Sequence, residues 1–218
     1  MNLISIILNT ANRPIELGRI LGSIELNTYQ NKEVIIVDDS RDKEAQITKD
    51  VVSKLKKELS TNILYMTTKE EGLDNNYRYN LAAARNIGVS EAMGNILMFL
   101  DDRYELDIDA LDKIALNCME DTWHYGKKRI KGTIVHKRPF IENFSWLFKK
   151  DFRKFGCFNE RINKYGGLSQ DIRERWESSC GLKFNQEDVF ATEITRSQSN
   201  KNKASIAEMK MLLWKLNH

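Results

Sequence analysis

Two adjacent aspartates, Asp101 and Asp102, stand directly after the apolar run at residues 96–100. An apolar run of this length with polar flanks is typical of a strand buried on both faces of a parallel sheet. Ligand crevices in such sheets open at the carboxyl ends of the strands, where carboxylates can hold a divalent cation and phosphates. Neighbouring side chains on a strand point to opposite faces, so the two aspartates can differ in role only where the chain leaves the strand. The alternative interpretation is a strand end followed by an acidic turn.

The segments before this pair alternate between strand-like and helix-like patterns, as a parallel sheet with crossover helices requires. The sequence predicts strands over residues 3–8, 33–37, 63–66 and 96–100, and helices over 14–26, 43–59 and 81–93. Because the carboxyl ends of parallel strands share one edge of a sheet, we expect Thr10, Asp39 and Asp101 to face the same crevice.

Composition narrows the class of protein. The chain has 218 residues, which suits one α/β domain with a sizeable core. Its net charge of +3 is too small to make nucleic acid the main partner. The three cysteines show no Cys-x-x-Cys spacing, so a reducing cytoplasm fits better than a disulfide framework or a zinc site. The apolar N-terminal run lacks signal-peptide features and is too short to span a bilayer.

The second half of the chain is richer in aromatic residues. Six of them are spread over loops and short elements: Trp123, Trp146, Phe148, Phe152, Phe155 and Phe158. We expect most of these to form a small core, because aromatic side chains dominate burial. An exposed one would instead indicate a platform on which a sugar stacks.

Residues 201–218 have the spacing of an amphipathic basic helix. Such a tail can dock on the domain itself, on an anionic membrane surface or on a partner subunit. His124 and His136 are the histidines to weigh as metal ligands, and His136 ends an apparent strand over 130–135. Since no second ligand stands at metal-binding spacing, we expect a polar rim residue there.

Four short stretches follow one another in a recognisable order. They read SIILNTANRP at residues 5–14, VIIVDDS at 34–40, ARNIG at 84–88 with FLDD at 99–102, and FGCFNE at 155–160. Together they resemble the inverting family-two glycosyltransferases of the GT-A fold. The resemblance implies one α/β GT-A domain with a Rossmann-like sheet. Residues 1–103 would form the nucleotide-sugar-binding half, 104–200 the acceptor-binding and catalytic half, and 201–218 the tail helix.

The resemblance also implies a nucleotide-sugar donor, most often a UDP-sugar, at the carboxyl ends of the first strands. By position, Thr10, Asn12 and Asp39 would contact the nucleoside. Asp101 would face the nucleotide, and Asp102 would bind a divalent cation, Mn²⁺ or Mg²⁺, that bridges the diphosphate. Arg85 either reaches the nucleotide or forms a surface or helix-capping ion pair, and the sequence leaves both open.

This chain departs from the family pattern at two places. The family's metal motif is usually Asp-x-Asp, whereas here Arg103 takes the third position and offers an alternative partner for the diphosphate. An inverting transfer needs a base, and the Glu-Asp pair of the family's segment is replaced by Leu168 and Ser169. Asp171, at the start of a predicted helix, is our candidate base, with a simple helix cap as the alternative and Glu174 as the fallback.

We therefore expect an inverting hexosyltransferase that moves a sugar to a glycan or other hydroxyl acceptor, in polysaccharide or glycoconjugate synthesis. A weakened nucleotide- or glycan-binding subunit of a larger synthase is the second hypothesis. A sugar nucleotidyltransferase is a third, disfavoured because residues 9–14 contain no glycine for a phosphate loop. The expected location is the cytoplasm or the inner face of the membrane, reached through the tail helix, and a homodimer remains open.

Overall fold

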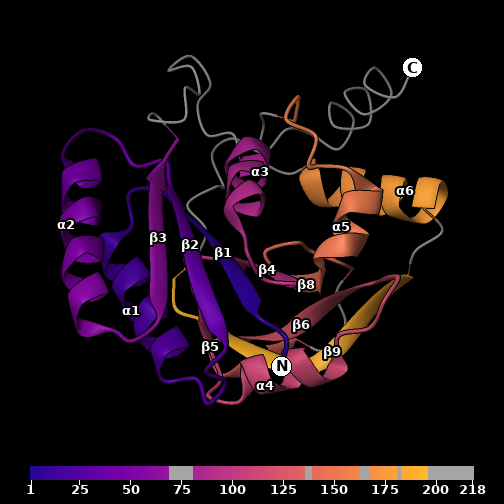
Figure 1. Ribbon diagram of the computed structural model, residues 1–218, viewed down its shortest axis with the longest axis horizontal. Coiled ribbons are helices and arrows are strands. Elements are labelled where there is room, and N and C mark those ends of the chain that lie inside the picture. The colour runs from indigo at the N-terminus through magenta and orange to yellow at the C-terminus, as the bar shows by residue number, and fades with distance from the viewer. Residues whose placement is uncertain (69–80, 136–138, 163–166, 181–182, 196–218) are drawn as a thin grey trace.

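Helices cover both faces of one long sheet in the computed structural model (Figure 1), which describes residues 1–68, 81–135, 139–162, 167–180 and 183–195. The strands are β1 (Ile4–Thr10), β2 (Lys32–Asp38), β3 (Asn62–Thr67), β4 (Ile96–Asp101), β5 (Tyr104–Leu106), β6 (Thr122–Ile130), β7 (Thr133–Val135), β8 (Phe144–Phe148) and β9 (Lys183–Glu193). The helices are α1 (Pro14–Glu25), α2 (Asp42–Glu58), α3 (Leu81–Glu91), α4 (Ala110–Asn117), α5 (Lys149–Phe155) and α6 (Leu168–Cys180). All seven elements predicted up to Asp101 are present, with shifts of one or two residues at their ends.

The first four strands are all parallel to one another and lie in the order β3-β2-β1-β4. Every residue of β1 and β2 is buried, which explains why the middle of each strand is an apolar run rather than an alternating pattern. The register places Thr10 beside Asp38 and Asn9 beside Asp101. The carboxyl ends of β1, β2 and β4 therefore meet at one edge, as the sequence predicted.

The remaining strands continue the sheet beyond β4 in the order β8-β6-β9-β5, with β8 antiparallel to β4. The single strand predicted over 130–135 is wrong, because β6 ends at Ile130 and β7 begins at Thr133. Lys131 and Gly132 between them both have positive φ, at 50° and 78°. Two such residues are what a tight hairpin turn requires.

Two hydrophobic cores lie on opposite faces of the sheet. One joins the sheet to α1, α2 and α4, and the other joins it to α3, α5 and α6. In Figure 1, α1 and α2 stand beside β3 on the left, and α5 and α6 stand on the right. The continuous burial of β1 and β2, and of β4 up to Leu100, follows from this double cover.

The aromatic residues of the second half mostly form a core, as expected. Trp123 is fully buried and packs against the rings of Phe99, Phe158 and Trp176 on the α3 face of the sheet. Of the six aromatics singled out in the sequence, only Phe148 is more than slightly exposed. The tail at 201–218 and His136 lie outside the described residues. Among the residues described, no helix has both the length and the apolar character needed to cross a membrane.

Candidate active site

The site is built where the ends of β1 and β4 meet. Thr10 is the last residue of β1, and its hydroxyl donates to a carboxylate oxygen of Asp102 across 2.8 Å. β4 ends at Asp101, so Asp102 belongs to the turn that leads into β5. The two aspartates therefore have different surroundings. Because the chain leaves the strand between them, they can take different roles.

Asp102 is a buried carboxylate with incomplete charge compensation. Arg13, just before α1, lies 3.6 Å from its second oxygen, which is longer than a hydrogen bond. Burial raises the pKa of Asp102 to about 6, Arg13 opposes the rise, and the neighbouring Asp101 adds to it. A cation bound beside this carboxylate would therefore stabilise its charged form.

Asp101, in contrast, is held by two arginines. Arg85 donates to one of its oxygens across 3.2 Å, and Arg103 donates to the other across 3.1 Å. Arg103 also lies 3.9 Å from Glu193 and 5.1 Å from the ring centre of Tyr104. Arg103 occupies the third position of the usual metal motif, where an aspartate is expected. Its guanidinium thus balances the negative charge of Asp101 within the protein.

Arg85 is only 1% exposed, which rules out the surface ion pair weighed in the sequence. It bridges Asp101 to Glu142, whose carboxylate lies 2.9 Å from its second terminal nitrogen. Glu142 in turn accepts from the hydroxyl of Ser169 in α6. Arg85 and the Ser169 hydroxyl hold the pKa of Glu142 below its usual value against the effect of burial. A buried polar chain therefore links the end of β4 to the first turn of α6.

The loops after β1 and β2 are tied to each other. The backbone N–H of Asn12 donates to Ser40, and the Asn12 side-chain oxygen accepts from the backbone N–H of Arg41. The backbone N–H of Asp39 donates to the carbonyl of Thr10, and its carboxylate accepts from Thr68 across 2.6 Å. These contacts bring the predicted nucleoside residues to one edge and fix the loops that carry them.

Asp171 lies in the first turn of α6, three residues after its first residue, so it is not a cap in the strict sense. Its side chain is buried and accepts two bonds from Arg175, at 2.9 and 2.6 Å. The fallback Glu174 accepts from Gln170. Both Arg175 bonds reach the Oδ2 atom of Asp171, whereas the Oδ1 atom accepts one long bond of 3.4 Å from Asn159.

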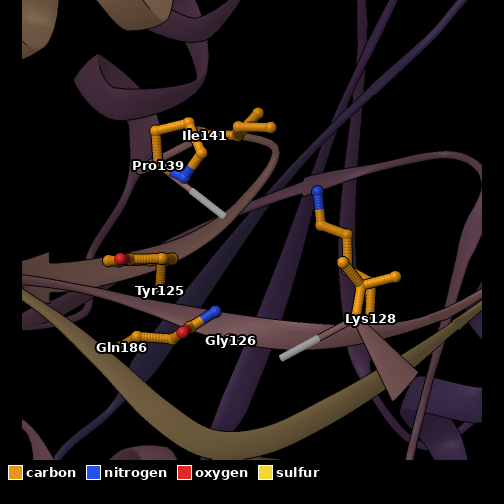
Figure 2. Close-up of a pocket in the computed structure, with 7 residues that line it drawn as sticks. Tyr125, Gly126, Lys128, Pro139, Ile141 and Gln186 are labelled. Atoms are coloured by element: carbon orange, nitrogen blue, oxygen red, sulfur yellow. The ribbon is translucent and has the colours of Figure 1, made fainter. Parts of the chain in front are cut away.

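A small hollow lies between β6, the start of β9 and the segment before β8 (Figure 2). Tyr125 and Gln186 line one side and Lys128 the other, with Pro139 and Ile141 above them. The same segment continues to Asn143, whose carbonyl accepts the backbone N–H of Asp101 and whose side chain accepts from Lys128. Lys128 on the wall of the hollow thus contacts the residue that pairs with the backbone of Asp101.

The residues present fit a divalent cation held mainly by a substrate. In the described parts of the chain, no three His, Cys, Asp or Glu side chains gather into a metal cluster. Mg²⁺ and similar ions are commonly held by one or two carboxylates together with substrate phosphates, and Asp102 meets that need. His124 is not available, because its ring accepts from the backbone N–H of Met119 and contacts Glu187.

Comparison with known proteins decides the family. Residues 5–122, more than half of the chain, match the model of glycosyl transferase family 2. The chain belongs to glycosyl transferase family 2. Two relatives are a GalNAc(5)-diNAcBac-PP-undecaprenol beta-1,3-glucosyltransferase of Campylobacter jejuni and an uncharacterized glycosyltransferase of Haemophilus influenzae. The first is 28% identical over 74% of this chain and 55% of its own length, and the second is 36% identical over 55% and 43%. The chain thus spans about half the length of these relatives.

Solved structures confirm the GT-A fold for this family 2 chain. GalNAc-T7 with UDP, GalNAc and Mn²⁺ superposes with a TM-score of 0.72 at 15% identity, over 98% of this chain and 48% of that one. Staphylococcus aureus TarS 1–349 with UDP-GlcNAc gives 0.72 at 16% identity, over 96% and 64%. The Pyrobaculum calidifontis mannosyltransferase PcManGT with GDP-Man and Mn²⁺ gives 0.68 at 14%, over 98% and 68%.

Sequence reasoning missed three residues of the site in this family 2 chain. Glu142 lies far from Arg85 in sequence, and only the pairing of β8 with β4 brings the two together. Arg13 directly precedes Pro14, which starts α1. That position could have indicated that Arg13 lies at the carboxyl end of β1, next to the site. Asn9 is buried near the end of β1, and the sequence pattern alone pointed to Thr10, the next residue, as the one facing the crevice.

Proposed function

We propose that this chain transfers a sugar from a nucleoside diphosphate donor, chiefly a UDP-sugar, to a hydroxyl group of a glycan or other acceptor. The observation that carries the proposal is the meeting of Thr10, Asp101 and Asp102 at the shared edge of β1 and β4. Family membership and the UDP- or GDP-linked ligands of the solved relatives support it. We place the product in polysaccharide or glycoconjugate synthesis.

In this proposal the donor lies along the edge of the sheet. Thr10, Asn12 and Asp39 contact the nucleoside, and Asp101 faces the nucleotide with Arg85 fixing its position. Asp102 would hold Mn²⁺ or Mg²⁺, which when bound neutralises charge on the departing diphosphate. The raised pKa of Asp102 supports this assignment, because a bound cation would stabilise its charged form.

The transfer proposed is a single displacement with inversion. The acceptor hydroxyl gives its proton to Asp171, its oxygen forms a bond to the anomeric carbon, and the carbon–oxygen bond to the diphosphate breaks with the electron pair leaving on the diphosphate. Arg175 occupies only the Oδ2 atom of Asp171, so the Oδ1 atom would receive the proton. We place the acceptor at the hollow lined by Tyr125, Lys128 and Gln186, because Lys128 donates to Asn143, whose carbonyl pairs with the backbone of Asp101.

The first test is a calorimetric titration of UDP into the protein with and without Mn²⁺. Micromolar binding corresponds to about −8 kcal/mol and is readily measured. Tighter binding with Mn²⁺ that is lost in Asp102→Ala supports the donor site. Glu105→Ala, a change at an exposed ion pair with Arg19, is the control and should bind like the wild type. No binding of any nucleoside diphosphate would refute the proposal.

The paired state of Asp171 favours a second candidate, a nucleotide-binding subunit of a larger synthase with little activity of its own. Screening sugar donors for release of nucleoside diphosphate separates the two. Transfer that disappears in Asp171→Asn, while UDP still binds, supports the enzyme and the base. Donor binding without transfer supports the subunit.

Two expectations about partners stay predictions. Membrane contact through residues 201–218 is tested by sedimentation with anionic liposomes, with and without that segment; equal binding would exclude the tail from this role. A homodimer is tested by light scattering at several protein concentrations.

A further inference from the structure

Glu142 carries a buried carboxylate that the proposed transfer does not use. The residue is 6% exposed, and its two carboxylate oxygens have different partners. Oε1 lies 2.9 Å from a terminal nitrogen of Arg85, and Oε2 accepts from the hydroxyl of Ser169. Although burial acts to raise the pKa of Glu142, Arg85 and Ser169 hold it below its usual value, so the carboxylate is ionised at neutral pH. An ionised oxygen with a hydroxyl donor already in place is able to receive a proton.

Glu142 lies between the hollow and the aspartate pair. Its predecessor Ile141 lines the hollow (Figure 2), and the carbonyl of its successor Asn143 accepts the backbone N–H of Asp101. Arg85, which contacts Glu142, also donates to the side chain of Asp101. The carboxylate therefore stands between the place proposed for the acceptor and the end of β4, where the donor is proposed to bind.

Ser169 faces Glu142 from the first turn of α6, whereas Asp171 faces another side of the same helix. Side chains two residues apart in an α-helix point about 200° apart around its axis. The Ser169 hydroxyl contacts Glu142, but the Asp171 carboxylate contacts Arg175 and Asn159. Ser169 is only half-buried, so its oxygen can accept a bond from a substrate hydroxyl while its own proton points to Glu142. The serine thus joins the surface of the site to a buried carboxylate.

We propose that Glu142 receives the proton of the acceptor hydroxyl through the hydroxyl of Ser169. This inference rests on the proposed function but names a proton acceptor other than Asp171, on the side of α6 that is linked to Asp101. The acceptor O–H bond breaks and its proton passes to the Ser169 oxygen, while the Ser169 proton passes to Glu142. The acceptor oxygen bonds to the anomeric carbon, and the electron pair of the broken carbon–oxygen bond leaves on the diphosphate. Ser169 ends neutral and Glu142 ends protonated.

Proton transfer to Glu142 also changes the charge next to Asp101. Ionised Glu142 compensates the guanidinium of Arg85, and protonated Glu142 does not. Arg85 is then paired with Asp101 alone, so positive charge rises at the end of β4 as the diphosphate takes up negative charge. Charges interact more strongly in such a buried site than in water. The arrangement therefore couples deprotonation of the acceptor to departure of the diphosphate.

The test compares Glu142→Gln, Ser169→Ala and Ser169→Thr with the wild type. The probes are UDP-glucose and UDP-GlcNAc with Mn²⁺, and transfer to water or to simple methyl glycosides is measured as release of UDP. Glutamine keeps an oxygen for Arg85 but takes up no proton at neutral pH. Glu142→Gln and Ser169→Ala should each lower kcat by roughly 100-fold or more, which is the contribution of a positioned proton acceptor. Ser169→Thr keeps the hydroxyl and should retain most of kcat.

Binding of UDP separates proton transfer from a structural role. Calorimetry with UDP and Mn²⁺ should give the wild-type Kd for all three variants, because Arg85 and Asp101 stay in contact. Ser178→Ala is the matched control, since Ser178 lies exposed near the far end of the same helix and should leave kcat unchanged.

Three results would each overturn the proposal: an unchanged kcat in Glu142→Gln, a loss of UDP binding in that variant, or a threonine variant as slow as the alanine variant. If Glu142→Gln does not fold, the two Ser169 variants decide in the same way. A wild type that binds UDP without transferring sugar would also overturn it and would support the non-catalytic subunit. A wild type that binds no UDP would instead reveal a failure of the proposed function itself.

Discussion

Replacing Asp102 with asparagine should stabilise the metal-free protein at neutral pH. Burial raises the pKa of this carboxyl from 3.8 to about 6. A shift of about two units, at 1.36 kcal/mol per unit, means that ionised Asp102 costs the folded state about 3 kcal/mol at pH 7. Asparagine keeps an oxygen that can accept from Thr10 but carries no charge. The variant should therefore gain up to about 3 kcal/mol in free energy of unfolding.

The gain in free energy of unfolding should increase with pH. Because the pKa of Asp102 is higher in the folded state, the protonated carboxyl favours folding. This favourable contribution to the wild type's stability is fully present below about pH 4 and is lost as the pH rises through about 6. The stability difference between Asp102→Asn and the wild type should thus be near zero at pH 4 and largest at pH 7. Other carboxyl groups titrate in both proteins and largely cancel in the difference.

The assay is denaturant or thermal unfolding in the presence of a chelator, at pH values from 4 to about 8. For a chain of this size, about 3 kcal/mol corresponds to a rise in unfolding temperature of roughly 6–12 °C. Asp101→Asn is the matched control and should lose stability, because Arg85 and Arg103 both donate to that carboxylate. An Asp102→Asn protein that is less stable at pH 7, or whose gain is the same at pH 4, would refute the electrostatic reasoning.

Four further changes test the packing that holds the site and its surroundings. Arg85→Met leaves Asp101 and Glu142 without their shared cation and should cost about 3–5 kcal/mol of stability in denaturant unfolding. Arg19→Met at an ion pair whose arginine side chain is 54% exposed should change stability by less than about 1 kcal/mol. Gly88→Ala would place a methyl group 2.6 Å from an Ile7 carbon and should cost about 1–3 kcal/mol. By contrast Gly22→Ala, in α1 with open space around it, should stabilise by up to about 1 kcal/mol.

The first half of the fold could be predicted because each element leaves a local signal. β1, β2 and β4 each contain an uninterrupted apolar run, at residues 6–8, 34–37 and 96–100, and Pro14 starts α1 where its fixed φ is suited to a first turn. The second half gives weaker signals. Lys131 and Gly132 form a turn inside a segment that the sequence pattern predicts as one strand. A lysine rarely has positive φ, so nothing in the sequence indicated the turn at Lys131.

The candidate site divides in the same way. Thr10, Asp101 and Asp102 could be placed at one edge from strand order alone, and the structure brings them together. The partners of their charges could not be predicted. Arg85 meets Glu142 only because β8 runs antiparallel beside β4, a pairing that no local pattern in the sequence specifies.

These partners, rather than the strand itself, distinguish the two aspartates. Both stand at the end of the same strand, yet the pairing of β8 with β4 brings Glu142 and Arg85 to the side of Asp101, while the start of α1 brings only a distant Arg13 to Asp102. Two arginines satisfy Asp101, and so it is suited to hold its position without a ligand. Asp102 keeps an incompletely compensated charge, and so it gains most from a cation delivered with a diphosphate. The same electrostatic difference therefore predicts opposite stability changes for the two asparagine variants and supports our proposal that Asp102 holds the metal.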